Sequence, residues 1–154
     1  MAVIYSNMGG IVSKKQLASR SMFIGGIVEL VIATLHFYPM PFQITQAREF
    51  AMLSNDYRSI IFLETISVGL CITVFGTLSI YFSKKLLAGE KTAWVFGLSQ
   101  GILWAGRTIF ELILPVKIPL LFLANPTVLL LPLLMLLTLL FLVPLLAFRT
   151  EWRF

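Results

Sequence analysis

Long apolar stretches alternate with short polar segments along the chain, and four of the stretches are long enough to cross a membrane as helices. The predicted spans are residues 22–42, 59–82, 92–115 and 126–148. A helical stretch of about 20 apolar residues covers the hydrocarbon core of a bilayer. We therefore predict an all-α integral membrane protein, with residues 1–154 forming a single compact bundle of four transmembrane helices.

The segments that flank the spans are mostly polar. Residues 1–20 contain Ser and Lys and are expected to form a cytoplasmic lead-in to the first span. At the start of the fourth span, Asn125 fits the capping position and Pro126 the first helical position. Residues 116–124 are apolar but too short to cross a bilayer, so we expect an interfacial or re-entrant connector there.

The composition indicates that this protein lies in a membrane rather than in water. Of the 154 residues, 58% are hydrophobic and 12% are charged, whereas about 25% are charged in a typical soluble domain. A small water-soluble domain exposes too much of its surface to hide so many apolar side chains. This excludes a soluble globular enzyme. A basic stripe with interleaved aromatic residues is missing from the sequence, so we expect no nucleic-acid partner.

The net charge of +5 is distributed unevenly about the predicted spans. Eight Lys and Arg residues fall on the side of the two termini, and three fall on the other side. The eight are Lys14, Lys15, Arg20, Lys84, Lys85, Lys91, Arg149 and Arg153, and the three are Arg48, Arg58 and Lys117. Because Lys and Arg concentrate in cytoplasmic loops, we predict a multi-pass protein with both termini in the cytoplasm.

Five ionisable side chains fall inside the predicted spans: Glu29, His36, Glu64, Arg107 and Glu111. An ionisable group in a bilayer is costly, so each one is a candidate site residue that needs a partner. At about 1.5 Å per residue, all except Glu29 lie roughly 6–12 Å below the outer interface, and Glu29 lies roughly 20 Å below it. We expect a polar site in the outer half of the bundle.

Helical spacing gives each of the first three spans one polar face. The residues that share a face are Glu29 and His36, then Glu64, Ser67 and Cys71, and finally Gln100, Trp104, Arg107 and Glu111. Arg107 and Glu111 are four residues apart and can pair directly. The fourth span has no ionisable residue, so we expect the first three spans to line the interior and the fourth to carry the least functional surface.

These residue types suit acid and base chemistry on a lipophilic substrate that enters from the bilayer. One of the buried carboxyl groups of Glu64 and Glu111 would pair with Arg107, while the other would stay protonated and act as an acid. His36 would shuttle the proton or hold a substrate hydroxyl group. The catalytic candidates are Glu64, Glu111 and His36, and the substrate-binding candidates are Arg107, Trp104, Gln100 and Glu29. Isomerisation or cyclisation would fit this set.

Three other interpretations remain open from the sequence. The charged residues could be an ion-pair network that fixes helix register. The chain could be a non-catalytic accessory subunit that packs its apolar fourth helix against a larger membrane complex. It could also be a proton-coupled carrier in which Glu29 links the outer layer to the cytoplasmic half. The layout resembles that of membrane sterol-isomerase-like modules in architecture alone, without a shared motif, so it implies no residue roles.

We expect no cofactor and no metal site. The chain has one His and one Cys, and it lacks the Glu-x-x-His pattern of di-iron bundles. A haem held by His36, with Met40 as a weak second ligand, is a less favoured alternative. The expected partners are membrane lipid and a lipophilic small molecule, with another membrane protein or a second copy of the chain as a further candidate.

Overall fold

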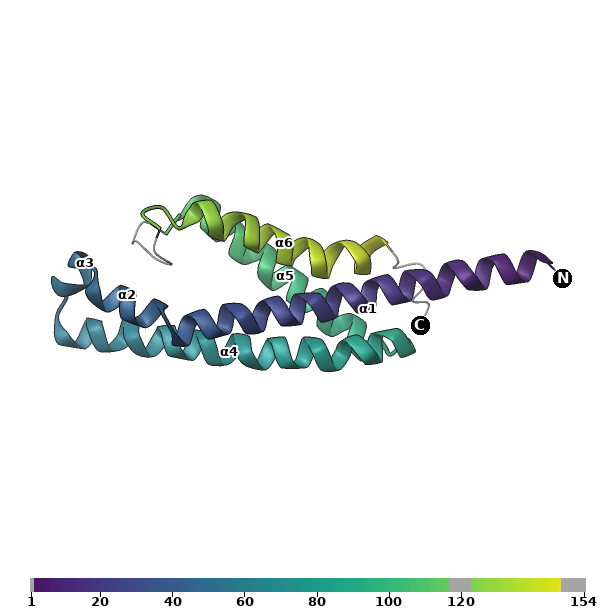
Figure 1. Ribbon diagram of the computed structural model, residues 1–154, viewed down its shortest axis with the longest axis horizontal. Coiled ribbons are helices and arrows are strands. Elements are labelled where there is room, and N and C mark those ends of the chain that lie inside the picture. Colours follow the sequence, from purple (N-terminus) through teal and green to yellow (C-terminus); the bar gives the residue numbers. More distant parts are fainter. Residues whose placement is uncertain (1, 117–122, 148–154) are drawn as a thin grey trace.

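The computed structural model describes residues 2–116 and 123–147, which form helices joined by short connections (Figure 1). The four long helices are α1 (Ala2–Phe37), α4 (Asn55–Ala88), α5 (Lys91–Ile113) and α6 (Thr127–Ala147). Two short helices, α2 (Met40–Gln46) and α3 (Arg48–Ala51), connect α1 to α4. The prediction of four long helices and an all-α fold is therefore confirmed for the described residues.

Three stretches of the described chain are long and apolar enough to cross a membrane: Lys14–Gln46, Asn55–Ala88 and Thr127–Leu146. Helix α5 has 23 residues, which is also a sufficient length. It is not among the three apolar stretches, and it carries Gln100, Arg107 and Glu111 within its length. The structure thus supports three candidate spans, and the fourth remains a prediction.

The first predicted span differs most from the structure. Helix α1 begins at Ala2, so residues 2–20 of the predicted lead-in are helical and continue directly into the first span, because Ala, Leu, Gln and Lys favour a helix even where the sequence is polar. Helix α1 ends at Phe37 rather than at residue 42, since Pro39 disfavours a helical conformation at the residue before it. Of the predicted connector at 116–124, residues 117–122 lie outside the described chain.

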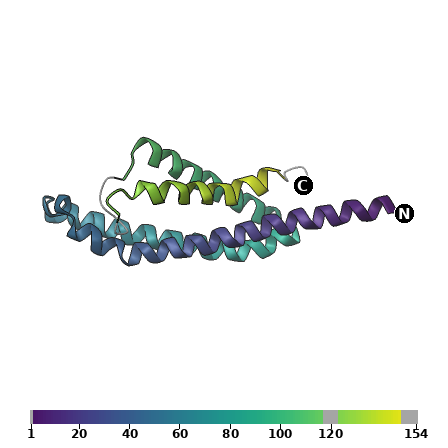
Figure 2. The same cartoon turned by 45° about the horizontal axis from the view of Figure 1, so that its top comes forward.

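Helix α1 lies along α4, and α5 lies along α6, so the fold consists of two helix pairs (Figures 1 and 2). Helices α1 and α4 approach closely at two glycines. A Cβ atom added to Gly26 would lie 2.8 Å from the carbonyl oxygen of Gly76, which shows that only a residue without a side chain fits there. The two helices are staggered, because α1 starts beyond the end of α4, and α4 starts beyond the end of α1 (Figure 1).

A tight turn joins the two pairs at one end. Gly89 has a φ of 86°, and its N–H and that of Glu90 bond to the carbonyl groups of Leu86 and Lys85, as in a glycine-terminated helix end. The Nζ atom of Lys85 also lies 3.0 Å from a carboxylate oxygen of Glu90. From this turn, α5 and α6 diverge from α1 and α4 toward the end that carries α2 and α3 (Figure 2).

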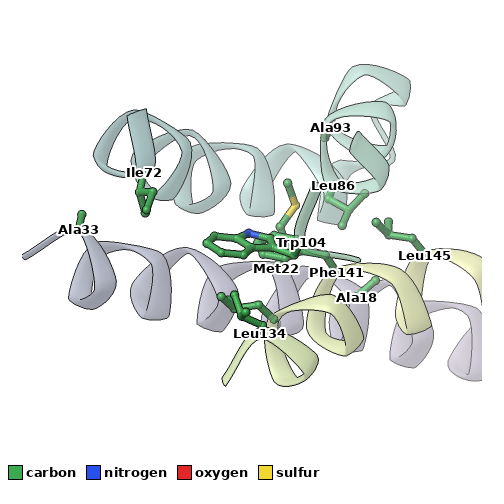
Figure 3. Close-up of a cluster of buried hydrophobic side chains, with 11 residues drawn as sticks. Ala18, Met22, Ala33, Ile72, Leu86, Ala93, Trp104, Leu134, Phe141 and Leu145 are labelled. Carbon is green, nitrogen blue, oxygen red and sulfur yellow. The ribbon is translucent and has the colours of Figure 1, made fainter. Parts of the chain in front are cut away.

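The apolar core lies where the two pairs meet (Figure 3). Helix α6 supplies Leu134, Leu137, Phe141 and Leu145, which are among the most buried side chains. The expectation that the first three spans alone line the interior is therefore wrong. A sequence of Leu and Phe without polar residues does not distinguish a helix that faces lipid from one at the centre of a bundle.

Candidate functional site

A cavity of about 590 Å³ lies between the two helix pairs, which is within the usual range of about 300–1,000 Å³ for small-molecule sites. It is lined by residues of α1, α4, α5 and α6, together with Met40 and Val116. Several lining side chains on α4 and α5 are exposed, including Val68, Ile102 and Phe110. The cavity therefore opens on the side of the bundle, between α4 and α5, where these two helices have diverged.

The polar side chains that line the cavity gather toward one of its ends, among apolar ones, and the other end is lined by apolar residues alone. On α4 its lining begins with Glu64, Ser67 and Cys71 and continues with Ile72 and Phe75. The eleven steps from Glu64 to Phe75 correspond to about 16 Å along the helix axis. The expectation that Glu64, Ser67 and Cys71 share one face is confirmed, because all three line the cavity.

Helices α1 and α5 each add one polar side chain toward the same end, where Met40 and Phe110 are apolar neighbours. His36 lines the cavity near the end of α1, and Ile32 lies one turn earlier. On α5, which runs antiparallel to α4, Arg107 precedes Phe110, and Leu103 and Trp104 lie one turn before Arg107. Polar groups from three helices therefore line the part of the cavity nearer α2, and the opposite part has apolar walls.

Glu64 is placed differently from the expectation. Its side chain is exposed, so the prediction of a buried carboxyl group at this position is wrong. It forms neither a hydrogen bond nor an ion pair with any described residue. The buried face of α4 runs through Gly69, Ile72 and Gly76, and Glu64 lies on the neighbouring stripe. Depth along the helix was predictable, whereas rotation about its axis was not.

Glu111 is fully buried, as expected, and it pairs with Arg107, since Nη2 of Arg107 lies 2.9 Å from Oε2 of Glu111. Its other oxygen accepts hydrogen bonds from the Val116 N–H at 3.0 Å and from the Thr127 hydroxyl group at 2.9 Å. Three donors around one carboxylate match the acceptor-only chemistry of its ionised form. Glu111 is not among the cavity-lining residues. It connects the end of α5 to the start of α6.

Glu29 is also fully buried. Its Oε1 accepts a hydrogen bond of 2.7 Å from Nε1 of Trp104, and its Oε2 accepts one of 2.9 Å from the Ser79 hydroxyl group. The carboxyl group therefore joins α1, α4 and α5. It does not line the cavity, but the Trp104 indole that contacts it does.

His36 and Gln100 are the remaining predicted site residues. Nδ1 of His36 lies 2.9 Å from the Ile32 carbonyl oxygen. Because a carbonyl oxygen only accepts, Nδ1 carries the hydrogen, and Nε2 of the neutral ring is an acceptor. Gln100 is buried, its side-chain oxygen has no partner among the described residues, and it does not line the cavity. The structure brings His36, Glu64, Arg107 and Trp104 to one cavity and leaves Glu29, Gln100 and Glu111 outside it.

Two hydroxyl groups that hold the buried carboxylates were not predicted as site residues. Ser79 lies on the stripe of α4 that includes Gly69, Ile72, Gly76 and Ser83. This spacing of small residues was a usable signal for a helix contact. Thr127 lies in the first turn of α6, where a hydroxyl group is also expected at a membrane interface. Its bond to Glu111 could not be inferred from that position.

The described residues contain no group of three or more His, Cys, Asp or Glu side chains placed to hold a metal ion. Comparison with known proteins adds no candidate function: no family model, no characterised protein and no solved structure matches this chain.

Proposed function

We propose that this chain is a four-span membrane protein with both termini in the cytoplasm. Three stretches are apolar enough to cross a bilayer, and α5 lies between them in the same bundle. The start of α1, the α4–α5 turn and the end of α6 lie toward the same end of the molecule (Figure 1). Of the Lys and Arg residues in the described part of the chain, six lie toward that end, as the positive-inside rule requires of a cytoplasmic face: Lys14, Lys15, Arg20, Lys84, Lys85 and Lys91.

We further propose that the cavity binds a lipophilic small molecule that carries one polar end. The observation that supports this is that His36, Glu64 and Arg107 gather toward one end of a mostly apolar cavity, whose other end has apolar walls at Ile72 and Phe75. The sideways opening lets such a molecule enter from the hydrocarbon core without crossing water. Membrane lipid would occupy the opening in its absence.

If the bound molecule is also transformed, His36 and Glu64 are the acid and base. Both line the cavity, and neither carboxylate oxygen of Glu64 is bonded within the described chain. Glu111 is unsuitable as a proton donor, because three hydrogen-bond donors already surround its carboxylate. Of the three catalytic candidates from the sequence, our proposal therefore keeps His36 and Glu64 and omits Glu111.

Gly106 provides a direct test of binding. It lines the cavity, and a Cβ atom added there would meet nothing within 4 Å. Gly106→Leu should fill the cavity while the helix remains intact. The probe is undecanol carrying bromine at its chain end, which quenches a tryptophan in contact with it. In nanodiscs, we expect its affinity to fall about tenfold or more in Gly106→Leu.

Ser99→Leu is the matched control, because Ser99 is an exposed residue of the same helix that does not line the cavity. Its affinity for the probe should equal that of the unmodified protein. Equal, saturable binding to both variants and to the unmodified chain would place the probe elsewhere and overturn the proposal. An absence of saturable binding to the unmodified chain would overturn it as well.

A further inference from the structure

We infer that the ligand of this cavity is a lipophilic cation, with a protonated amine as its polar end and a single apolar body. This inference rests on the binding function proposed above and specifies the chemical class of the ligand. It follows from the balance of charge and of hydrogen-bond donors and acceptors among the polar groups that line the cavity.

The positive charge in the cavity wall is already matched. Arg107 is paired with Glu111 at 2.9 Å, and the two charges belong to residues one turn apart on α5. The guanidinium group therefore does not leave an unbalanced positive charge for an anionic ligand. A carboxylate or phosphate ligand would have to compete with a fully buried carboxylate that three donors hold in place.

The negative charge in the wall is not matched. Glu64 lines the same cavity from α4 and has no cation or hydrogen-bond donor among the described residues. An ionisable group within a span is normally paired, because the surrounding hydrocarbon cannot solvate it. A bound molecule with a cationic end would supply this counter-charge from within the cavity.

His36 adds a second acceptor. Its Nδ1 donates to the Ile32 carbonyl group, so Nε2 of the neutral ring has a free lone pair. An ammonium group carries up to three N–H donors and no acceptor. It can therefore satisfy an imidazole and a carboxylate together, which a carboxylate or an ether cannot do.

The apolar walls define the rest of the molecule. From Glu64 to Phe75 the lining of α4 extends about 16 Å, and Phe75, Ile72 and Trp104 lie at its apolar end. An amine held at Glu64 would thus extend a hydrocarbon chain or a linear ring system toward Trp104. The indole is at once a wall of the cavity and a reporter of its occupancy.

The test compares three probes that share a bromine-tipped undecyl chain and differ in the polar end: an ammonium, an alcohol and a carboxylate. They are titrated into the full-length protein in nanodiscs of a zwitterionic lipid. Quenching is followed in a Trp94→Phe/Trp152→Phe background, where Trp104 is the remaining tryptophan. Native mass spectrometry of the unmodified chain counts bound probe independently, so the result does not depend on that background.

We expect the ammonium probe to bind about tenfold more tightly than the alcohol, and the carboxylate more weakly than either. Glu64→Gln should abolish the preference for the ammonium over the alcohol. Asp56→Asn is the matched control, because it removes the same charge from the same helix, outside the cavity lining. It should retain the preference.

Equal affinities for the three probes, a preference for the carboxylate, or a preference for the ammonium that survives Glu64→Gln would each overturn the cationic assignment. In those cases, binding of the alcohol that is sensitive to Gly106→Leu would leave the proposed binding function intact. Failure of all three probes to bind in a saturable way would overturn both.

Discussion

Trp104 of α5 donates its indole N–H to a carboxylate oxygen of Glu29 in α1, at 2.7 Å, and both side chains are buried. Ser79 of α4 donates to the other oxygen of the same carboxyl group. A single carboxyl group therefore connects three helices. Because Trp104 also lines the cavity, this contact fixes the position of an indole ring in the cavity wall.

The first prediction concerns this contact. Glu29→Leu leaves the buried indole N–H of Trp104 without an acceptor, which should lower the free energy of unfolding by about 1–3 kcal/mol. Trp104→Phe removes the unsatisfied donor, so the double variant should be less unstable than the sum of the two single changes. Unfolding by denaturant in mixed micelles measures the coupling, and a value near zero would contradict the contact.

The second prediction distinguishes the two buried carboxylates by isosteric change. Glu29→Gln keeps an acceptor for Trp104, and its amide can donate to the Ser79 hydroxyl group, which rotates to accept. Its stability should change little. Glu111→Gln places an amide among three donors, so one amide N–H would point at another donor. We expect the free energy of unfolding to fall by about 1–3 kcal/mol. Equal effects of the two changes would show that this account of Glu111 is wrong.

The third prediction concerns the Arg107–Glu111 pair. Arg107 has 41% of its side chain exposed, whereas Glu111 has none. Removing one partner of a fully buried ion pair lowers the free energy of unfolding by about 3–5 kcal/mol. Because Arg107 is partly exposed, Arg107→Leu should lower it by less than that. Glu111→Leu should cost more than Arg107→Leu, because it also leaves the Val116 N–H and the Thr127 hydroxyl group unpaired. The reverse order of unfolding free energies would refute this.

The fourth prediction uses two glycines of α5. Gly106 has open space around it, so Gly106→Ala should raise the unfolding free energy by about 0.5–1 kcal/mol, the usual gain from replacing glycine within a helix. At Gly101, an added Cβ would lie 2.5 Å from a methyl carbon of Leu142. Gly101→Ala should therefore destabilise the protein by about 1–3 kcal/mol through overpacking. Thermal unfolding of the pair in one detergent decides the sign of each change.

The fifth prediction concerns topology. In a Cys71→Ala background, a cysteine at Ser54 should react with an impermeant maleimide from outside intact cells. A cysteine at Ala88 should react only after permeabilisation. Ala88 is chosen over Gly89 because the φ of 86° at Gly89 disfavours any side chain. Labelling of position 88 from outside, with protection of position 54, would reverse the proposed orientation.

The sequence predicted the helices well, because long apolar runs bounded by polar or Gly and Pro residues determine where helices begin and end. It also predicted local pairs on one helix, such as Arg107 with Glu111 and the shared face of Glu64 and Cys71. Such pairs depend only on the helical repeat. The largest difference in bounds, in α1, arose because the predicted span began with the apolar run at residue 22, whereas the helix also includes the polar residues before it.

Contacts between helices were the part that sequence could not determine. Glu29 was assigned to ligand binding as an ionisable residue within a predicted span, but its partners Trp104 and Ser79 come from two other helices whose rotations are set by packing. The Leu and Phe residues of α6 are equally compatible with a lipid-facing surface and with a buried core. Thr127 is the first residue of α6, and no spacing pattern relates it to Glu111 of α5, so its bond to that carboxylate could not be inferred.

The stagger between α1 and α4 has a mechanical consequence. A helix of 36 residues is about 54 Å long, and the hydrocarbon core of a bilayer is about 30 Å thick. The first turns of α1, which project beyond α4 (Figure 1), therefore form a stiff arm continuous with the segment that carries Glu29 and His36. A force or a docking event on that arm would tilt α1 as a whole, and the part of the cavity wall that α1 supplies would move with it.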